Sequence, residues 1–208
     1  MNKRLWILAS VVGLFSGVSS VYGAEAPNAG TPPSADEQKA YAELGQRGVL
    51  VQPLAAGSNW FYVSFRGADK PDSALYSLLK GVPGTVELDL SGQKLAESDF
   101  NALEGLKNLR KLNLSKSSVN DAALSHLSGL SKLESLNLFQ TEVGDAGLAN
   151  LKGMAGLKRL YVYQTKVTDT GIEQVKAAMP GVKVEKGGAV LLPPKKDEPK
   201  KDDAEAKK

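Results

Sequence analysis

The sequence predicts an α/β solenoid, a stack of strand–turn–helix units, because its apolar residues recur every 24 positions. Five apolar columns keep this step in a common register. They contain Leu88, Leu112, Leu136 and Leu160; Leu90, Leu114, Leu138 and Val162; Leu95, Val119, Val143 and Val167; Phe100, Leu124, Leu148 and Ile172; and Leu103, Leu127, Leu151 and Val175. A fixed period of this length is typical of repeat proteins, whose units each pack on their neighbours. We expect a parallel sheet on the concave face and helices on the convex face.

The first 35 residues are expected to contain a removable export signal, residues 1–23, and a flexible linker, residues 24–35. Lys3 and Arg4 precede an apolar run, and small residues precede Ala24 in the pattern of a cleavage site. The apolar run is shorter than the roughly 20 residues that span a bilayer. We therefore expect export to the periplasm, the cell envelope or the medium, with no membrane span after cleavage; retention of the segment as an uncleaved membrane anchor is the alternative.

Residues 36–81 are expected to form an N-terminal cap and a degenerate first repeat. Residues 36–46 have the spacing of a helix, and residues 49–54 and 60–65 are two β-prone runs separated by a turn. Apolar residues of this first unit precede their counterparts in the next unit by 25 positions rather than 24. One extra residue near Pro83-Gly84 would explain the change.

Residues 82–192 are expected to hold four full repeats and a C-terminal cap. The predicted strands are Val86–Leu90, Lys111–Leu114, Ser135–Leu138 and Arg159–Val162; the predicted helices are Glu97–Leu106, Asp121–Leu130, Asp145–Met154 and Asp169–Met179. After a last strand at Pro180–Val184, residues 189–192 are expected to fold back over the sheet edge. Residues 193–208, rich in Lys, Pro, Asp and Glu, are expected to be disordered because they carry too little apolar area to bury.

Two units also carry a family resemblance. Leu133-x-x-Leu-x-Leu-x-x-Thr-x-Val-x-Asp-x-Gly-Leu148 and its counterpart from Leu157 to Ile172 resemble bacterial leucine-rich repeats. They are similar to the cysteine-containing repeats of F-box proteins, with Thr141 and Thr165 where the cysteine usually falls. With its signal and charged tail, the chain resembles exported proteins common in planctomycetes. The resemblance covers about residues 60–187 and implies a curved solenoid for protein or ligand contact, without catalytic residues.

The composition excludes several classes of function. The chain has no cysteine, so disulfides and thiolate chemistry are excluded. Removal of the signal takes away two basic residues and leaves 24 basic against 23 acidic residues. Such a near-neutral chain lacks the concentrated basic surface that nucleic-acid binding requires, so we expect no nucleic-acid partner.

No catalytic, cofactor-binding or metal-binding residue is expected, and no cofactor. His126 is the single histidine and should point outward from a helix, and no hydrolase or zinc motif is present. One acidic residue per repeat forms a column: Asp121, Asp145 and Asp169. We prefer helix starts to a cation site as its explanation, since acids suit the first turn of a helix. The hydroxyl column of Ser117, Thr141 and Thr165 is expected to bond turn backbone between repeats.

The exposed face of the sheet is the best candidate site. Side chains alternate along a strand, so the neighbours of the buried leucines should face outward. This face is expected to change from acidic, at Glu87 and Asp89, to basic and aromatic in the last repeat. The predicted partner-binding residues are Lys111, Asn113, Asn137, Phe139, Arg159, Tyr161 and Tyr163. Exposed aromatics beside arginine are typical of binding hot spots, although strands also favour aromatics for packing alone.

The sequence therefore predicts a non-enzymatic, exported binding module of the cell envelope. The partner would be an unidentified protein or peptide, anchored by burial of the rings and hydrogen-bonded by Asn113 and Asn137. Two alternatives remain open: binding of a glycan or envelope polysaccharide, and a structural role as an envelope spacer. The sequence makes no prediction of the oligomeric state.

Overall fold

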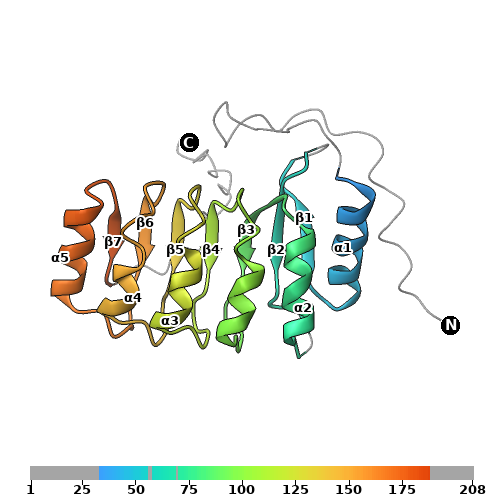
Figure 1. Ribbon diagram of the computed structural model, residues 1–208. Helices are drawn as coiled ribbons and strands as arrows, with labels where there is room; N and C mark the ends of the chain where they lie inside the picture. Colours follow the sequence, from blue (N-terminus) through green and yellow to red (C-terminus); the bar gives the residue numbers. More distant parts are fainter. Residues whose placement is uncertain (1–32, 56–57, 69, 188–208) are drawn as a thin grey trace, which may run out of the picture.

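The computed structural model describes residues 33–55, 58–68 and 70–187, which form one solenoid (Figure 1). Its single sheet holds seven strands in chain order. The strands are β1 (Leu50–Pro53), β2 (Phe61–Ser64), β3 (Thr85–Asp89), β4 (Lys111–Asn113), β5 (Ser135–Asn137), β6 (Arg159–Tyr161) and β7 (Lys183–Glu185). β1 runs antiparallel to β2, and each later neighbouring pair is parallel. Each repeat therefore adds one parallel strand.

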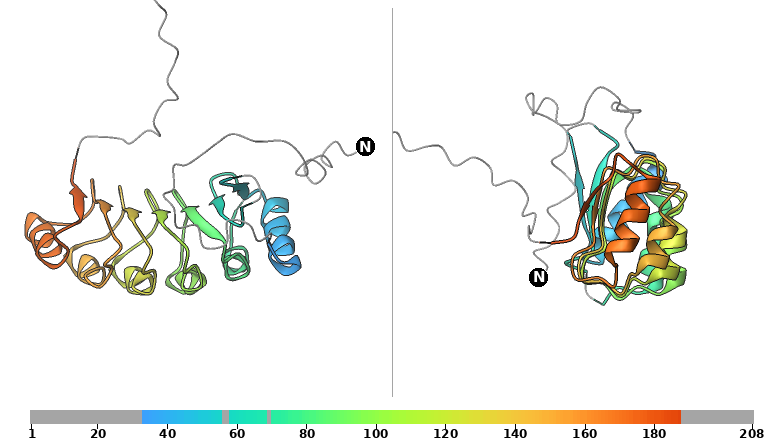
Figure 2. Two further views of the ribbon diagram at one scale, coloured as in Figure 1. Left: turned by 90° about the horizontal axis from the view of Figure 1, so that it is seen from above. Right: turned by 90° about the vertical axis from the view of Figure 1, so that its left-hand side faces the viewer.

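Helices cover one side of this sheet. The α-helices are α1 (Ala35–Gln46), α2 (Ser73–Ser77), α3 (Asp121–Leu124), α4 (Asp145–Ala149) and α5 (Asp169–Ala178), and the 3₁₀-helices are η1 (Leu78–Gly81), η2 (Glu97–Ala102) and η3 (Ser125–Leu127). Figure 2 shows the helices on the outer side of an arc and the strands on its inner side. The predicted α/β solenoid, with a concave parallel sheet and a helix-and-strand cap at its N-terminal end, is confirmed.

The 24-residue period of the sequence sets the register in which neighbouring strands pair. Leu112 pairs with Leu136, which pairs with Leu160. The ladder continues beyond the strands, where the N–H of Lys116 donates to the carbonyl of Phe139 at 2.7 Å. Because every repeat repeats this pairing, equivalent side chains of successive units lie in rows across the sheet.

The first repeat departs from this step, as predicted. Phe61 pairs with Thr85, but Tyr62 pairs with Glu87, so the register shifts inside the strand pair. The extra residue is Val86, in β3, two positions after Pro83-Gly84. Val86 is fully buried despite this irregularity.

The apolar columns form one continuous core between the sheet and the helices. At its N-terminal end α1 covers the first repeat with Tyr41 and Leu44, and the Tyr41 ring lies 4.1 Å from that of Phe61, centroid to centroid. A capping box fixes the start of α1: Ser34 and Glu37 each accept a hydrogen bond from the other's backbone N–H. This cap keeps the end of the core out of water.

Most helices are shorter than predicted, which is a correction with a clear physical cause. From Leu124 the buried residues follow at every third position, Leu127, Leu130 and Leu133, and each is joined to the next by a backbone bond of three-residue span from Leu127 onward. A period of three matches the 3₁₀ conformation better than the 3.6-residue α-helix. The convex side therefore contains one or two α-helical turns followed by 3₁₀ turns.

The last repeat, in contrast, has buried residues at α-helical spacing. Its buried residues Ile172, Val175 and Met179 are spaced by three and then four positions, and α5 is a regular helix of 10 residues. This spacing puts all three on one face of an α-helix. The prediction of residues 169–179 is accurate here to within one residue.

Each full repeat turns out of its strand through a left-handed residue. Gly92, Lys116, Gln140 and Gln164 have φ between 55° and 73°, and they are again 24 positions apart. The left-handed conformation costs a non-glycine residue roughly 1–2 kcal/mol. The repeat therefore imposes this turn even where its residue is not glycine.

Several predictions fall outside the described residues: the signal at residues 1–23, most of the linker, the returning segment 189–192 and the tail 193–208. Within the described ranges, no helix combines the length and apolar character needed to cross a bilayer.

Replacing Leu136 with alanine tests whether burial of the apolar columns between stacked repeats stabilises the fold. Leu136 is fully buried in the middle repeat, so its truncation should lower the free energy of unfolding by about 2–5 kcal/mol. Leu50→Ala is the matched control, because Leu50 is 52% exposed and should change stability by less than about 0.5 kcal/mol. Urea denaturation followed by circular dichroism measures both; an unchanged midpoint for Leu136→Ala would contradict the account.

Candidate functional site

The concave face of the sheet carries the predicted residues in three rows. The register places Lys111 beside Ser135 and Arg159, and Asn113 beside Asn137 and Tyr161. Phe139 and Tyr163 follow the strands in the third row, joined by the ladder bond from Gln140 N–H to the carbonyl of Tyr163. The seven predicted residues are half-buried or exposed, whereas the leucines between them are buried. The structure therefore brings all seven onto one face.

Three rings form an aromatic cluster at the C-terminal end of this face, which we define as Phe139, Tyr161 and Tyr163. The rings of Phe139 and Tyr163 stack, with centroids 5.7 Å apart and planes inclined by 8°. The Lys116 ammonium lies 5.8 Å from the centroid of the Phe139 ring. Tyr163 is 44% exposed and Tyr161 is half-buried. The stack holds two of the rings in place while leaving apolar area in contact with water.

The side-chain oxygens of the two asparagines are engaged at the ends of their own strands. Asn113 Oδ1 accepts a hydrogen bond from the N–H of Ser115 at 3.1 Å, and Asn137 Oδ1 accepts one from Phe139 at 2.9 Å. Such bonds to the residue two positions on are the mark of an Asx turn. These amides therefore orient the strand ends, and in particular the backbone of Phe139. Hydrogen bonding of Asn113 and Asn137 to a partner stays a prediction.

The two predicted cations of this face differ in their surroundings. Lys111 Nζ lies 2.7 Å from a carboxylate oxygen of Glu87, one strand away in the same row. Arg159 is exposed and has no carboxylate partner among the residues that the structure describes. Of the two, Arg159 is the one whose charge is free to attract an anion.

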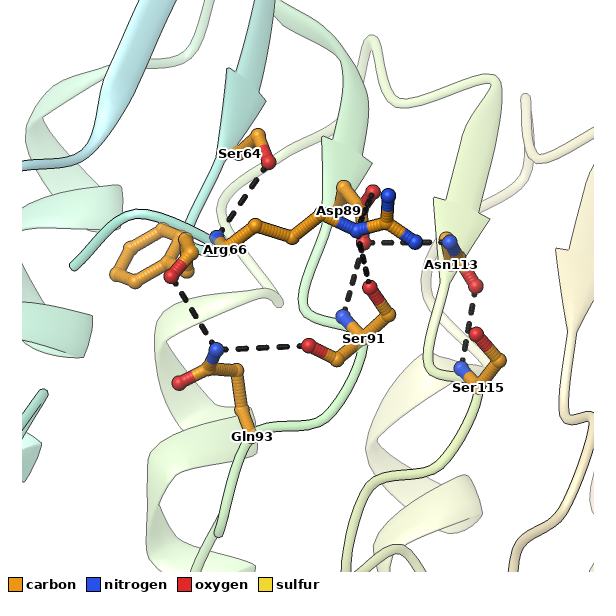
Figure 3. Close-up of polar contacts among 8 residues, drawn as sticks. Ser64, Arg66, Asp89, Ser91, Gln93, Asn113 and Ser115 are labelled. Atoms are coloured by element: carbon orange, nitrogen blue, oxygen red, sulfur yellow. Dashed lines mark hydrogen bonds and ion pairs between the residues drawn. The ribbon is translucent and has the colours of Figure 1, made fainter. Parts of the chain in front are cut away.

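A polar cluster at the other end of the face went unnoticed in the sequence. Arg66 Nε lies 3.2 Å from Asp89 Oδ2 and donates to Ser91 Oγ at 2.8 Å. Asp89 Oδ1 accepts bonds from the Ser91 N–H and from Asn113 Nδ2, and its side chain is only 10% exposed. Figure 3 shows the Arg66 side chain lying along the sheet over Asp89. We call Arg66, Asp89, Ser91 and Asn113 the arginine cluster.

This cluster corrects the expectation of an acidic end. Both acids in that region have a cation within ion-pair distance, Glu87 with Lys111 and Asp89 with Arg66. The 25-residue step of the first repeat places Arg66 beside Ser91, so applying that step to the sequence would have located Arg66 at this end of the face. The acids of the predicted acidic end are therefore paired with cations, whereas at the other end Arg159 has no carboxylate partner among the described residues.

The hydroxyl column is structural, but it acts within repeats rather than between them. Ser117, Thr141 and Thr165 each donate to the backbone carbonyl three positions earlier, at 2.5–2.7 Å. The expectation of bonds between repeats was wrong because the turn brings the hydroxyl back to its own strand end. The column closes the turn that follows each strand.

The acidic column does mark helix starts, as preferred, and it also links neighbouring repeats. Asp121, Asp145 and Asp169 each open a helix. Asp145 accepts hydrogen bonds from the side chain and the backbone N–H of Thr168, and these bonds lower the pKa of its carboxyl. No group of three metal-binding side chains occurs in the part of the chain that the structure describes. Asp121 and Asp145 thus cap the repeat that follows each of them, whereas Asp169 pairs with Lys186.

His126 is half-buried rather than pointing freely outward. Its Nδ1 lies 3.1 Å from Glu104 Oε1, and its Nε2 lies 3.9 Å from Glu97 Oε1. Both partners lie on the convex, helical side, in or just after η2. His126 therefore joins two neighbouring repeats and takes no part in the concave face.

Comparisons with known proteins give structural likenesses only. The sequence matches no protein-family model and no curated protein. The structure is similar to an internalin, InlF, from Listeria monocytogenes, with 24% identity and a TM-score of 0.46, over 54% of this chain and 31% of that chain. Internalin C2 from the same species has 25% identity and a TM-score of 0.43, over 52% and 44%.

A plant protein has a similar fold over more of its own length. The leucine-rich-repeat ectodomain of the receptor kinase SOBIR1 from Arabidopsis thaliana has 17% identity and a TM-score of 0.46, over 74% of this chain and 93% of that chain. By contrast, the matches span less than half of either internalin chain.

Proposed function

We propose that this chain is a non-enzymatic module that binds a protein or peptide on its concave face. The observation that carries the proposal is the aromatic cluster. The apolar core, the turns and the helix starts all follow from the 24-residue repeat, whereas the cluster occurs in only two repeats. Its rings are not needed for stacking the units, since the columns that stack them are buried behind the sheet.

The geometry of the cluster favours recognition. An aromatic side chain buries roughly 150–250 Å² when it is covered, which makes such rings large contributors to interface energy. The stacking of Phe139 on Tyr163 restrains both rings beforehand, so a partner meets a surface that loses little side-chain entropy on binding. Arg159 and Lys116 provide cations beside the rings, and the combination of aromatics with arginine is typical of binding hot spots.

The surroundings do not favour catalysis. On the concave face, hydroxyls such as Ser91 lie beside asparagine, arginine and a paired aspartate, without a histidine to act as base. A hollow of about 280 Å³ beside the turns after α4 and α5 is lined by Lys152 and by apolar groups including Leu157, Met179 and Val182. Neither place joins a nucleophile to a general base, so we assign no catalytic residue and no cofactor.

A double substitution in the cluster tests the proposal. Tyr161→Ala combined with Tyr163→Ala should abolish capture of the native partner by the full chain, because it removes most of the apolar contact area. The melting temperature should stay close to that of the parent, since Tyr163 is exposed and Tyr161 is half-buried. Quantitative mass spectrometry of affinity pull-downs from the native organism provides the measurement.

The matched control is Leu50→Ala, which removes an exposed apolar side chain from the opposite edge of the sheet and should leave capture unchanged. Retained capture by the double variant would contradict the proposal. A glycan array with the same two variants distinguishes the partner class: tyrosine-dependent binding of a glycan, without any captured protein, would establish the alternative.

We also propose that the module works outside the cytoplasm. The support comes from the sequence alone, in the basic and apolar segment of residues 1–23. Intact-mass measurement of the chain recovered from cell fractions should find Ala24 as its first residue in the envelope, periplasm or medium. Recovery in the cytosol with Met1 retained would contradict export and would leave the binding proposal to its own test.

A further inference from the structure

In the arginine cluster, only the Nε atom of the Arg66 guanidinium group is engaged by neighbouring side chains that the structure describes. Asp89 and Ser91 hold the Nε atom of Arg66, but its two terminal nitrogens have no partner among the described residues. The Arg66 side chain is 67% exposed, while the Asp89 carboxylate beneath it is almost fully covered. A guanidinium held at Nε keeps its two terminal nitrogens available as a forked donor, which is the geometry that carboxylates accept.

The charges of the rest of this face favour the same kind of ligand. The three acids in its rows, Glu87, Asp89 and Glu185, each lie within 3.2 Å of a cationic nitrogen. Lys116 and Arg159, in contrast, have no carboxylate partner in the described part of the chain. The face therefore has a surplus of positive charge, carried by Lys116 and Arg159 beside the aromatic cluster.

We propose that the concave face binds an acidic peptide in a defined register. A carboxylate of the peptide pairs with the terminal nitrogens of Arg66, and an apolar or aromatic side chain of the same peptide packs on the aromatic cluster. This inference rests on the proposed function and names the chemistry of the partner.

The sheet register sets the spacing of the two contacts. Asp89, Asn113, Asn137 and Tyr161 lie in one row, three strand steps from end to end. Three steps of about 4.8 Å make about 14 Å between the two anchor points. An extended peptide advances about 3.3 Å per residue, so the acidic and the apolar residue should be about four positions apart.

The arrangement also explains why Asp89 does not repel such a ligand. Its Oδ2 faces Arg66 Nε and its Oδ1 accepts two hydrogen bonds from Ser91 and Asn113, so its lone pairs are directed within the cluster. The ion pair restrains the guanidinium and reduces the entropy that a bound peptide would cost. Asp89 thus acts as a positioning residue for Arg66.

Selection of random 12-residue peptides displayed on phage tests the inference on the full chain. Parent protein should enrich peptides with Asp or Glu about four positions from an aromatic or large apolar residue. Arg66→Gln should enrich peptides that keep the apolar residue but lose the acidic preference. Lys176→Gln is the matched control, since it removes the same charge from an exposed position on α5 and should select the parental pattern.

Affinities of one enriched peptide and its Glu→Gln analogue, measured by fluorescence anisotropy, complete a double-mutant cycle. On the parent the analogue should bind about tenfold more weakly, the size expected for loss of one charge-assisted pair. On Arg66→Gln the two peptides should bind equally. Arg66→Lys keeps the charge over Asp89 but loses the fork, so it should give an intermediate ratio and serves if Arg66→Gln is poorly folded.

The outcomes separate this inference from the proposed function. Enriched peptides that depend on Tyr161 and Tyr163 but show no acidic preference, or equal affinity of both peptides for the parent, overturn the acidic-peptide inference alone. Acidic peptides whose Glu→Gln loss persists on Arg66→Gln overturn the role of Arg66. If no peptide is enriched, or if the double tyrosine variant binds as the parent does, the inference fails together with peptide binding by this face.

Discussion

A strand–turn–helix unit of 24 residues cannot bury its own leucines, and this constraint governs the rest of the molecule. Each unit places one side of its strand and its convex turns against the units on either side, so Leu112, Leu136 and Leu160 occupy equivalent positions in one core. The pairing must therefore repeat residue by residue, and the ends of the stack need covers. α1 provides such a cover at the N-terminal end, with Tyr41 and Leu44 buried against the first repeat.

The same constraint separates structural polar groups from functional ones. Polar groups that recur every 24 residues have repeated structural partners: the hydroxyl column binds its own strand ends, and Asp121 and Asp145 cap the following repeats. Residues that do not recur with the 24-residue period have no such repeated structural partner. On the concave face these residues are Arg66, Phe139, Tyr161 and Tyr163. We therefore assign partner binding to the concave-face residues that depart from the repeat, on a surface that the repeat keeps rigid.

Much of the fold could be predicted because the period reports directly on the sheet. The strands of the full repeats were placed within one residue of their observed bounds, and the rows of outward side chains follow from alternation. The convex helices were overextended because apolar spacing was read as α-helical, although Leu124, Leu127 and Leu130 recur at every third position. The capping box of Ser34 and Glu37 was also present in the sequence, inside a segment otherwise typical of a linker.

The candidate site was only partly predictable. Its face and its aromatic residues follow from strand alternation, but the pairing of Lys111 with Glu87 depends on which strands are neighbours. The ion pair of Arg66 with Asp89 requires the 25-residue step of an irregular repeat, and its buried carboxylate cannot be recognised from residue types. The stacking of Phe139 on Tyr163 depends on rotamers that a sequence does not specify.

Site-specific photocrosslinking in the native organism tests the central claim, that the partner lies on the concave face, most directly. A benzoylphenylalanine at Ser135, between Lys111 and Arg159 on β5, probes that face, and one at exposed Gln174 on α5 probes the convex side. The account predicts that the Ser135 probe joins one recurring partner and the Gln174 probe does not. Equal labelling from both positions, or labelling from Gln174 alone, would contradict it.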